Sequence, residues 1–212
     1  MFKLRTLAPL CAALALGGCG GGGSKDLYVT VSFPYTPVSV FRVSTILPNL
    51  SGFDGHDQRC DQNSGALPTG MHINNDCSIS GRPTQVGTFT FGYKVRAEDT
   101  EGSFDNTASV TVIAPAVGYG AHQISVRLAA AVNDTPQIAN NGWIAPTDTT
   151  VTWSYQVASG SLAPGLSLNA ATGVVSGIPT TAGNFLAVIQ PVLSTSFGSI
   201  SLTPYSYQII AS

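Results

Sequence analysis

Charged residues are scarce in this chain, and their sum is close to neutral. Of the 212 residues, 9% are Asp, Glu, Lys or Arg, and the formal net charge at pH 7 is −2. A nucleic-acid-binding protein needs a basic surface that displaces counterions from phosphates. The composition therefore predicts no nucleic-acid partner. After the N-terminal region, no apolar run is long enough to span a bilayer.

The sequence also lacks the motifs of common enzyme classes. Serine is frequent, but no Gly-x-Ser-x-Gly elbow occurs between a strand and a helix. The Gly20–Gly23 run lacks the lysine and the helix of a phosphate-binding loop. His72 and His122 lie in strand-like segments, and we expect both to face water. We therefore predict that the protein is not an enzyme, has no catalytic residue and needs no cofactor.

The N-terminus has the pattern of an export signal. Lys3 and Arg5 precede an apolar run from Leu7 to Leu16, which is too short for a stable membrane anchor. The segment Leu16-Gly17-Gly18-Cys19 resembles a bacterial lipobox, in which the cysteine becomes the lipidated first residue of the mature protein. An ordinary cleaved signal next to an incidental cysteine is the alternative.

A flexible tether follows Cys19. The run of four glycines and one serine has almost no side-chain surface to bury. Residue 20 is Gly, where Asp would indicate retention at the inner membrane, so the resemblance to Gram-negative lipoproteins implies the outer membrane. We predict that residues 1–18 are a lipoprotein signal peptide and residues 19–25 are the lipidated cysteine and its tether. The N-terminal lipid would hold the protein on the membrane.

Two cysteines remain once the N-terminal pair, Cys11 and Cys19, is set aside. Cys60 and Cys77 are an even pair in an exported chain, which favours one disulfide. Their separation of 17 residues would make its contribution about 3 kcal/mol in the chain-entropy model. Two free thiols or a metal pair are the alternatives, although two cysteines without further Cys or spaced His make a poor zinc site.

One pattern occurs twice in the rest of the chain. Leu67–Asn74 (LPTGMHIN) and Leu162–Asn169 (LAPGLSLN) are each followed by Ser-Gly-x-Pro-Thr, then Gly and Phe. The copies are offset by 95 residues before the intervening turn and by 96 after it, so one residue is inserted between them. A period of this length matches a whole small β domain.

Apolar and polar residues alternate along most of both copies, as in Phe89–Ala97 and Val151–Val157. This period of two predicts strands with one face on a core. Trp153 lies on the alternating face, and we expect it in the core. Trp143 follows an Asn-Gly turn and could form an exposed platform for a glycan or a protein, although we favour its burial.

The repeated residues resemble a known family. Leu-Pro-x-Gly-Leu-Ser-Leu-Asn, Thr-Gly-x-x-Ser-Gly-x-Pro-Thr and Ala-Gly-x-Phe are similar to immunoglobulin-like modules of bacterial surface proteins, which are related to dystroglycan-type cadherin-like modules. The second copy is closer to this pattern than the first. The resemblance implies an all-β chain with two tandem immunoglobulin-like or cadherin-like β-sandwiches, at residues 26–115 and 117–212, after the signal peptide.

Members of this family are described as surface-exposed or associated with adhesion. The resemblance therefore implies a non-enzymatic cell-surface lipoprotein with a binding, adhesion or envelope-structural role. Its ligand would be a protein or a glycan at the cell surface. An accessory subunit of an envelope assembly, such as a pilus or a secretion system, is the alternative.

Alignment of the two copies places Cys60 at the position of Tyr155, an inward position of a strand. A bond from Cys60 to the turn at Cys77 would join the strand to the hairpin. The second copy has an aromatic ring in the same place. Similar lipoproteins carry a cysteine at this turn, and that resemblance favours the disulfide.

Cadherin-like modules often bind calcium, and the resemblance makes Asp99, Glu101 and Asp105 candidate ligands. Calcium prefers six or more oxygens, usually from several carboxylates. The second copy has Thr195 at the position of Asp99, with no acidic replacement nearby. We therefore predict no metal, and a calcium-dependent module stays an alternative.

A polar loop before Cys60 is the remaining candidate for chemistry. It contains Asp54, His56, Asp57 and Asp61, a set that could hold a transition metal or act in acid–base catalysis. A single loop supplies few convergent groups. We interpret it as a solvated surface loop.

Overall fold

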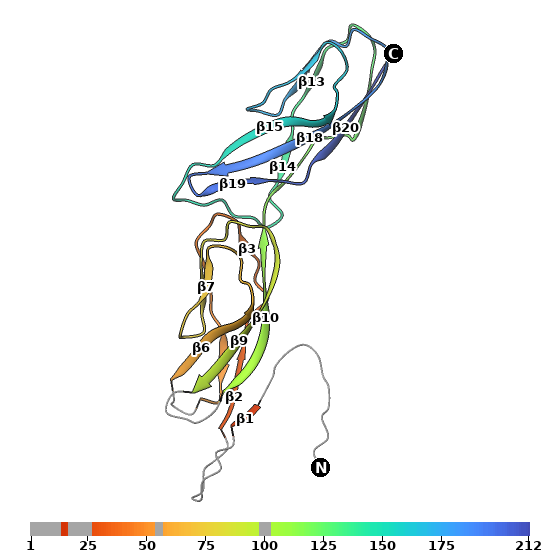
Figure 1. The fold of residues 1–212 in the computed structure, drawn as a ribbon. Helices are drawn as coiled ribbons and strands as arrows, with labels where there is room; N and C mark the ends of the chain where they lie inside the picture. The colour runs from red at the N-terminus through yellow and green to blue at the C-terminus, as the bar shows by residue number, and fades with distance from the viewer. Residues whose placement is uncertain (1–13, 17–26, 54–56, 98–102) are drawn as a thin grey trace, which may run out of the picture. The chain divides into compact units, whose positions relative to one another are not determined.

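The computed structural model describes residues 14–16, 27–53, 57–97 and 103–212, and every regular element in these ranges is a β-strand (Figure 1). The predicted all-β class is confirmed. Contacts divide the chain into two compact units, Met1–Val38 with Val43–Val112 and Ser39–Arg42 with Ile113–Ser212. Among the described residues, no helix has the length and apolar character of a membrane span.

The main sheet of the first unit has the strand order β3-β10-β9-β6. Its strands are β3 (Val38–Ser39), β6 (Gln58–Gly65), β9 (Gly87–Ala97) and β10 (Phe104–Ile113). Two smaller sheets have the orders β4-β8-β7 and β1-β2-β5. Their strands are β1 (Leu14–Leu16), β2 (Leu27–Ser32), β4 (Ser44–Ile46), β5 (Asn49–Ser51), β7 (Met71–Ile73) and β8 (Ile79–Gly81).

The core of the first unit lies between the main sheet and β2. Phe91, Tyr93 and Val95 alternate along β9 and are at most 1% exposed. Val29 and Val31 of β2 are equally buried. The Tyr93 hydroxyl donates a hydrogen bond to the Val31 carbonyl at 3.0 Å, which gives a buried polar atom its partner. Apolar packing and side-chain hydrogen bonds to Val31 therefore hold β2 against the sheet.

The second unit is built in the same way. Its main sheet has the order β12-β20-β18-β15, and β19 also pairs with β18. These strands are β12 (Gln123–Val126), β15 (Thr152–Gly160), β18 (Gly183–Thr195), β19 (Gly198–Ser201) and β20 (Tyr205–Ala211). Two smaller sheets contain β11 (Ala116–Gly118), β13 (Val132–Asp134), β14 (Gln137–Ala139), β16 (Leu166–Leu168) and β17 (Val175–Gly177).

The two tryptophans differ in burial. Trp143 is 8% exposed and belongs to the core, in agreement with the burial that we favoured. Trp153 on β15 is only partly buried, so the prediction that it lies in the core is confirmed only in part. Tyr155, two residues further along the same face, is 5% exposed and fills the interior instead.

The sequence repeat corresponds to a structural repeat. β6 has a bulge between Gln62 and Ser64, and β15 has one between Val157 and Ser159, which lie 95 residues later. The inserted residue lies in the following hairpin turn. Three residues separate the hydrogen-bonded Asn74 and Ser78, whereas four separate Asn169 and Val174.

The two units close this hairpin onto the neighbouring strand in different ways. Cys60 on β6 and Cys77 in the turn form a disulfide. In the second unit, Tyr155 takes the place of Cys60 and Gly173 that of Cys77, with φ of +73° against +67°. A Cβ on Gly173 would lie 2.8 Å from the Tyr155 ring, so only glycine leaves room for the ring. One unit has a covalent bond where the other has a packed aromatic ring.

Candidate functional site

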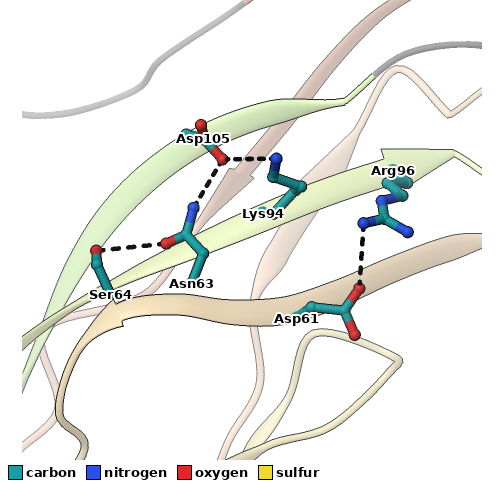
Figure 2. A network of polar contacts seen from close by, with 6 residues as sticks. All are labelled: Asp61, Asn63, Ser64, Lys94, Arg96 and Asp105. Carbon is teal, nitrogen blue, oxygen red and sulfur yellow. Dashed lines mark hydrogen bonds and ion pairs between the residues drawn. The ribbon is translucent and has the colours of Figure 1, made fainter.

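The outer face of the first unit's main sheet carries a polar network across three strands (Figure 2). The strand register places Lys94 of β9 between Asp61 of β6 and Asp105 of β10. The Lys94 Nζ atom lies 3.6 Å from the Asp105 carboxylate, and Asn63 donates to that carboxylate at 2.7 Å. Asp61 lies 4.0 Å from Arg96. The network therefore joins residues 42 positions apart in sequence, Asn63 and Asp105.

A glycine at the centre of this face makes room for the network. A Cβ on Gly92 would lie 2.1 Å from the Ser64 Oγ atom and 2.6 Å from the Asn63 Oδ1 atom. The two side chains therefore lie directly over the Gly92 backbone. Because the ion pairs are solvent-exposed, each contributes only about 0–1 kcal/mol. The network orients polar groups on the surface more than it stabilises the domain.

A groove of about 350 Å³ opens beside this face, at the edge of β10. Residues 31–35 and residues 106–109 line it, together with Thr90 and Tyr93 of β9. Tyr35 is 83% exposed at the rim. A second hollow, of about 380 Å³, shares Asn106 and Thr107 with the groove and extends to Asn63 and Asp105.

The groove exists because the first unit pairs less of its strand edge than the second. In the second unit, β12 pairs in parallel with β20 over four residues, and the Gln208 N–H donates to the His122 carbonyl just before β12. In the first unit, residues 33–37 form no strand, and the edge strand β3 is only Val38–Ser39. Within the described residues, β10 therefore has no strand partner on this side at residues 106–109.

Asn106 protects this open edge. Its Oδ1 atom accepts a hydrogen bond from the Thr107 N–H at 2.8 Å, and its Nδ2 atom donates to the Val31 carbonyl at 3.4 Å. The Thr107 N–H, which could otherwise pair with another strand, is thus already hydrogen-bonded. The side chain also holds the floor of the groove to β2.

The second unit has a different surface. Between residues 117 and 212, only Arg127, Asp134 and Asp148 are charged. Tyrosines gather at one place, where the Tyr207 hydroxyl donates to the Asp134 carboxylate at 3.0 Å and the Tyr205 hydroxyl to the Tyr119 carbonyl at 3.2 Å. Burial raises the pKa of Tyr207 and Tyr119 well above the usual value, and the Asp134 carboxylate adds to the shift.

We expect alkaline pH to destabilise the second unit. Because the folded phenols of Tyr119 and Tyr207 have raised pKa values, the unfolded chain loses its phenolic protons first, from about pH 10 upward. The contribution of these two tyrosines to the free energy of unfolding is complete below this pH and is lost as the pH rises. Melting followed by tryptophan fluorescence should shift to lower temperature between about pH 9 and pH 11.5. The exposed-tyrosine variant Tyr35→Phe should leave that shift unchanged, and a melting temperature independent of pH would contradict the expectation.

The structure places the remaining candidates as follows. Asp105 faces Lys94 and Asn63, while Asp99 and Glu101 lie outside the described residues, so the calcium hypothesis stays untested. Asp54 and His56 also lie outside them, as does Cys19. Among the residues that the structure does describe, no three His, Cys, Asp or Glu side chains gather as a metal site.

The histidines and the polar loop show no catalytic arrangement in the described part of the chain. Asp57 and Asp61 are described, and Asp61 lies between Arg59 and Arg96 at 3.8 and 4.0 Å. His72 and His122 are both exposed, as expected. The His122 ring stacks on Tyr205 with centroids 4.9 Å apart.

The groove could not be identified from the sequence. Tyr35, Asn106 and Thr107 carry no motif, and their proximity depends on how β2 and β10 meet. One local signal was present. Tyr35 lies in the segment Pro34-Tyr35-Thr36-Pro37, and two prolines so close together remove backbone donors and disfavour a paired strand.

These features define a tandem of immunoglobulin-like β-sandwich domains whose polar groups face outward. The chain belongs to the family described as "Putative Ig domain", which matches residues 28–113 and 123–210. No curated protein matches the sequence.

Several solved structures are similar to this chain at low identity and low TM-score. An endo-fucoidan hydrolase from glycoside hydrolase family 107 is 18% identical over 83% of this chain and 27% of its own, with a TM-score of 0.29. BT4661, a SusE-like surface located polysaccharide binding protein from Bacteroides thetaiotaomicron, is 15% identical over 86% of this chain and 34% of its own, with a TM-score of 0.32. Drosophila N-cadherin EC1-3 is 10% identical over 85% of this chain and 66% of its own, with a TM-score of 0.33. No functional conclusion follows from these likenesses.

Proposed function

We propose that this protein is a non-enzymatic binding protein, held by a lipid on Cys19 at the bacterial outer membrane, with a protein or a glycan ligand at the cell surface. The observation that carries the binding role is the open groove on the first domain, with its exposed tyrosine and its neighbouring polar network. The lipobox-like Leu16–Cys19 and the glycine-rich tether support the membrane location.

The two domains suit a binding role better than a catalytic one. Their interiors are filled by apolar side chains such as Phe91, Val95, Ile189 and Ile209, each at most 1% exposed. Recognition by such domains falls to loops and sheet edges that a rigid core holds in place. The groove at the edge of β10 is a surface of this kind.

The anchoring can be tested by one substitution. Cys19→Ser is expected to abolish lipid attachment and to release the protein from the membrane fraction, because the thiol is the proposed acceptor. Intact mass and sedimentation of membranes measure both effects. Cys11→Ser is the matched control, since Cys11 lies within the predicted signal peptide, and it should leave the lipid in place. An unmodified amino terminus in the wild-type protein would contradict the anchor.

Crosslinking of intact cells tests the binding role. A captured ligand from a host, a neighbouring cell or the surrounding polysaccharide supports recognition at the surface. Capture of envelope proteins of the same cell alone would instead indicate an accessory subunit of an envelope assembly.

A further inference from the structure

We propose that the groove of the first domain, between residues 31–35 and the edge of β10, binds an uncharged oligosaccharide. This inference rests on the proposed role as a binding protein and names the ligand class. It depends on three properties of the groove: its aromatic rim, its uncharged polar lining and its protected strand edge.

Tyr35 forms the aromatic rim of the groove. Its side chain is 83% exposed, although an aromatic ring of this size is costly to leave in water. Pro34 and Pro37 restrict the backbone on both sides of the ring. Phe33 packs edge-on against Tyr93, with centroids 5.4 Å apart, which fixes the start of the segment. A pyranose ring has an apolar C–H face that can cover such an exposed tyrosine.

The lining supplies hydrogen-bonding groups without charge. Thr90, Asn106, Thr107 and Ser109 contribute hydroxyl and amide groups, and none of the residues that line the groove is charged. The Thr90 and Ser109 hydroxyls lie 2.9 Å apart across the two strands. Sugar hydroxyls both donate and accept, as these groups do. The Asp105 carboxylate, which lines the adjoining hollow, is already engaged by Lys94 and Asn63.

A peptide strand is the competing occupant of an open sheet edge, and the edge chemistry disfavours it. Strand addition relies on main-chain hydrogen bonds to the edge. The Thr107 N–H already donates to the Asn106 side chain at 2.8 Å, and Asn106 is itself tied to Val31. An added strand would have to break these bonds first. An oligosaccharide uses the side chains and leaves them intact.

The size of the groove is consistent with a short glycan segment. Its volume is about 350 Å³. Small-molecule sites range from about 300 to 1,000 Å³. The adjoining hollow over Asn63 and Asp105 offers space for further sugar units along the sheet face.

The test is binding of the purified full-length protein in detergent to immobilised neutral hexasaccharides, with gluco-, manno- and xylo-oligomers as probes. A hexasaccharide of hyaluronan serves as the charged comparison. We expect at least one neutral probe to bind, and Tyr35→Ala to weaken it about tenfold or more, because the stacking surface is lost. Tyr35→Phe should retain most of the affinity. Thr107→Val, which removes a hydroxyl at similar volume, should also weaken binding.

The matched control is Gln123→Ala, since Gln123 begins β12, the strand that covers this edge in the second domain. It should leave the affinity unchanged, and all variants should keep the wild-type melting temperature. Amide NMR signals of Thr107 and Ser109 should move on addition of the bound glycan. The proposal is overturned if no neutral probe binds, if only the charged glycan or a peptide binds, or if Tyr35→Ala leaves affinity intact. If crosslinking on intact cells then captured a protein ligand, the broader binding role would still be supported.

Discussion

Removal of the Cys60–Cys77 disulfide is expected to lower the free energy of unfolding of the first domain by about 3 kcal/mol. The bond closes a loop with a sequence separation of 17 residues, so its loss restores chain entropy to the unfolded state. The double variant Cys60→Ala/Cys77→Gly is the appropriate change. Cys77 has a φ of +67°, which glycine adopts without strain and alanine does not.

The measurement can separate the two domains. Both tryptophans of the chain, Trp143 and Trp153, lie in the second domain, so their fluorescence during urea unfolding reports that domain alone. Amide signals of β9 report the first. We expect the β9 transition to move to lower urea and the tryptophan transition to stay in place. Equal stability of β9 with and without the disulfide would refute the expectation.

The second domain suggests the control for this experiment. Cys60→Tyr/Cys77→Gly installs the pair that Tyr155 and Gly173 form there. It should recover part of the lost stability, because a ring packed on glycine buries apolar surface where the disulfide was. If the two units are equivalent at this position, the ring should fit without further changes.

Gly177→Ala is expected to destabilise the second domain by roughly 3 kcal/mol or more, or to prevent its folding. Gly177 has a φ of +133°, and a Cβ there would lie 2.2 Å from the Gly165 carbonyl oxygen. That oxygen is held by the Ile178 N–H at 3.2 Å, so it cannot withdraw without losing a hydrogen bond. Tryptophan fluorescence during urea unfolding measures the effect.

A matched glycine in the same domain provides the control. A Cβ on Gly120 would meet no atom within 4 Å, so Gly120→Ala should change stability by less than about 0.5 kcal/mol. Similar transitions for Gly120→Ala and Gly177→Ala would show that the close approach at Gly177 can relax. In the first domain, Gly81 faces Gly70 in the same way, with a hypothetical Cβ 2.1 Å from the Gly70 oxygen.

The paired glycines explain why so much of the fold could be predicted from the sequence. The Leu-x-x-Gly and Ser-Gly-x-Pro-Thr segments recur because Gly70 and Gly81, like Gly165 and Gly177, must let two backbones touch. The alternation along Phe89–Ala97 predicted β9 because a strand places successive side chains on opposite faces. Such features are local, so composition and spacing reveal them directly.

The candidate site was not predictable in this way. The network of Asn63, Lys94 and Asp105 depends on the register of three strands, and a shift by one residue would turn each side chain to the other face. Trp153 shows the same dependence, because the sheet leaves it half-buried while Tyr155 fills the core.

The sequence by itself determined a duplicated all-β chain, its repeated turns and the pairing of its two internal cysteines as the favoured outcome. The tertiary structure alone decided that residues 33–35 line a groove with the edge of β10, that Tyr35 is exposed there and that Asn106 protects the edge. The physical reason is the distance in sequence over which each interaction acts. Turn and strand preferences act between near neighbours, whereas a groove is formed by segments more than 70 residues apart, such as Val31 and Asn106.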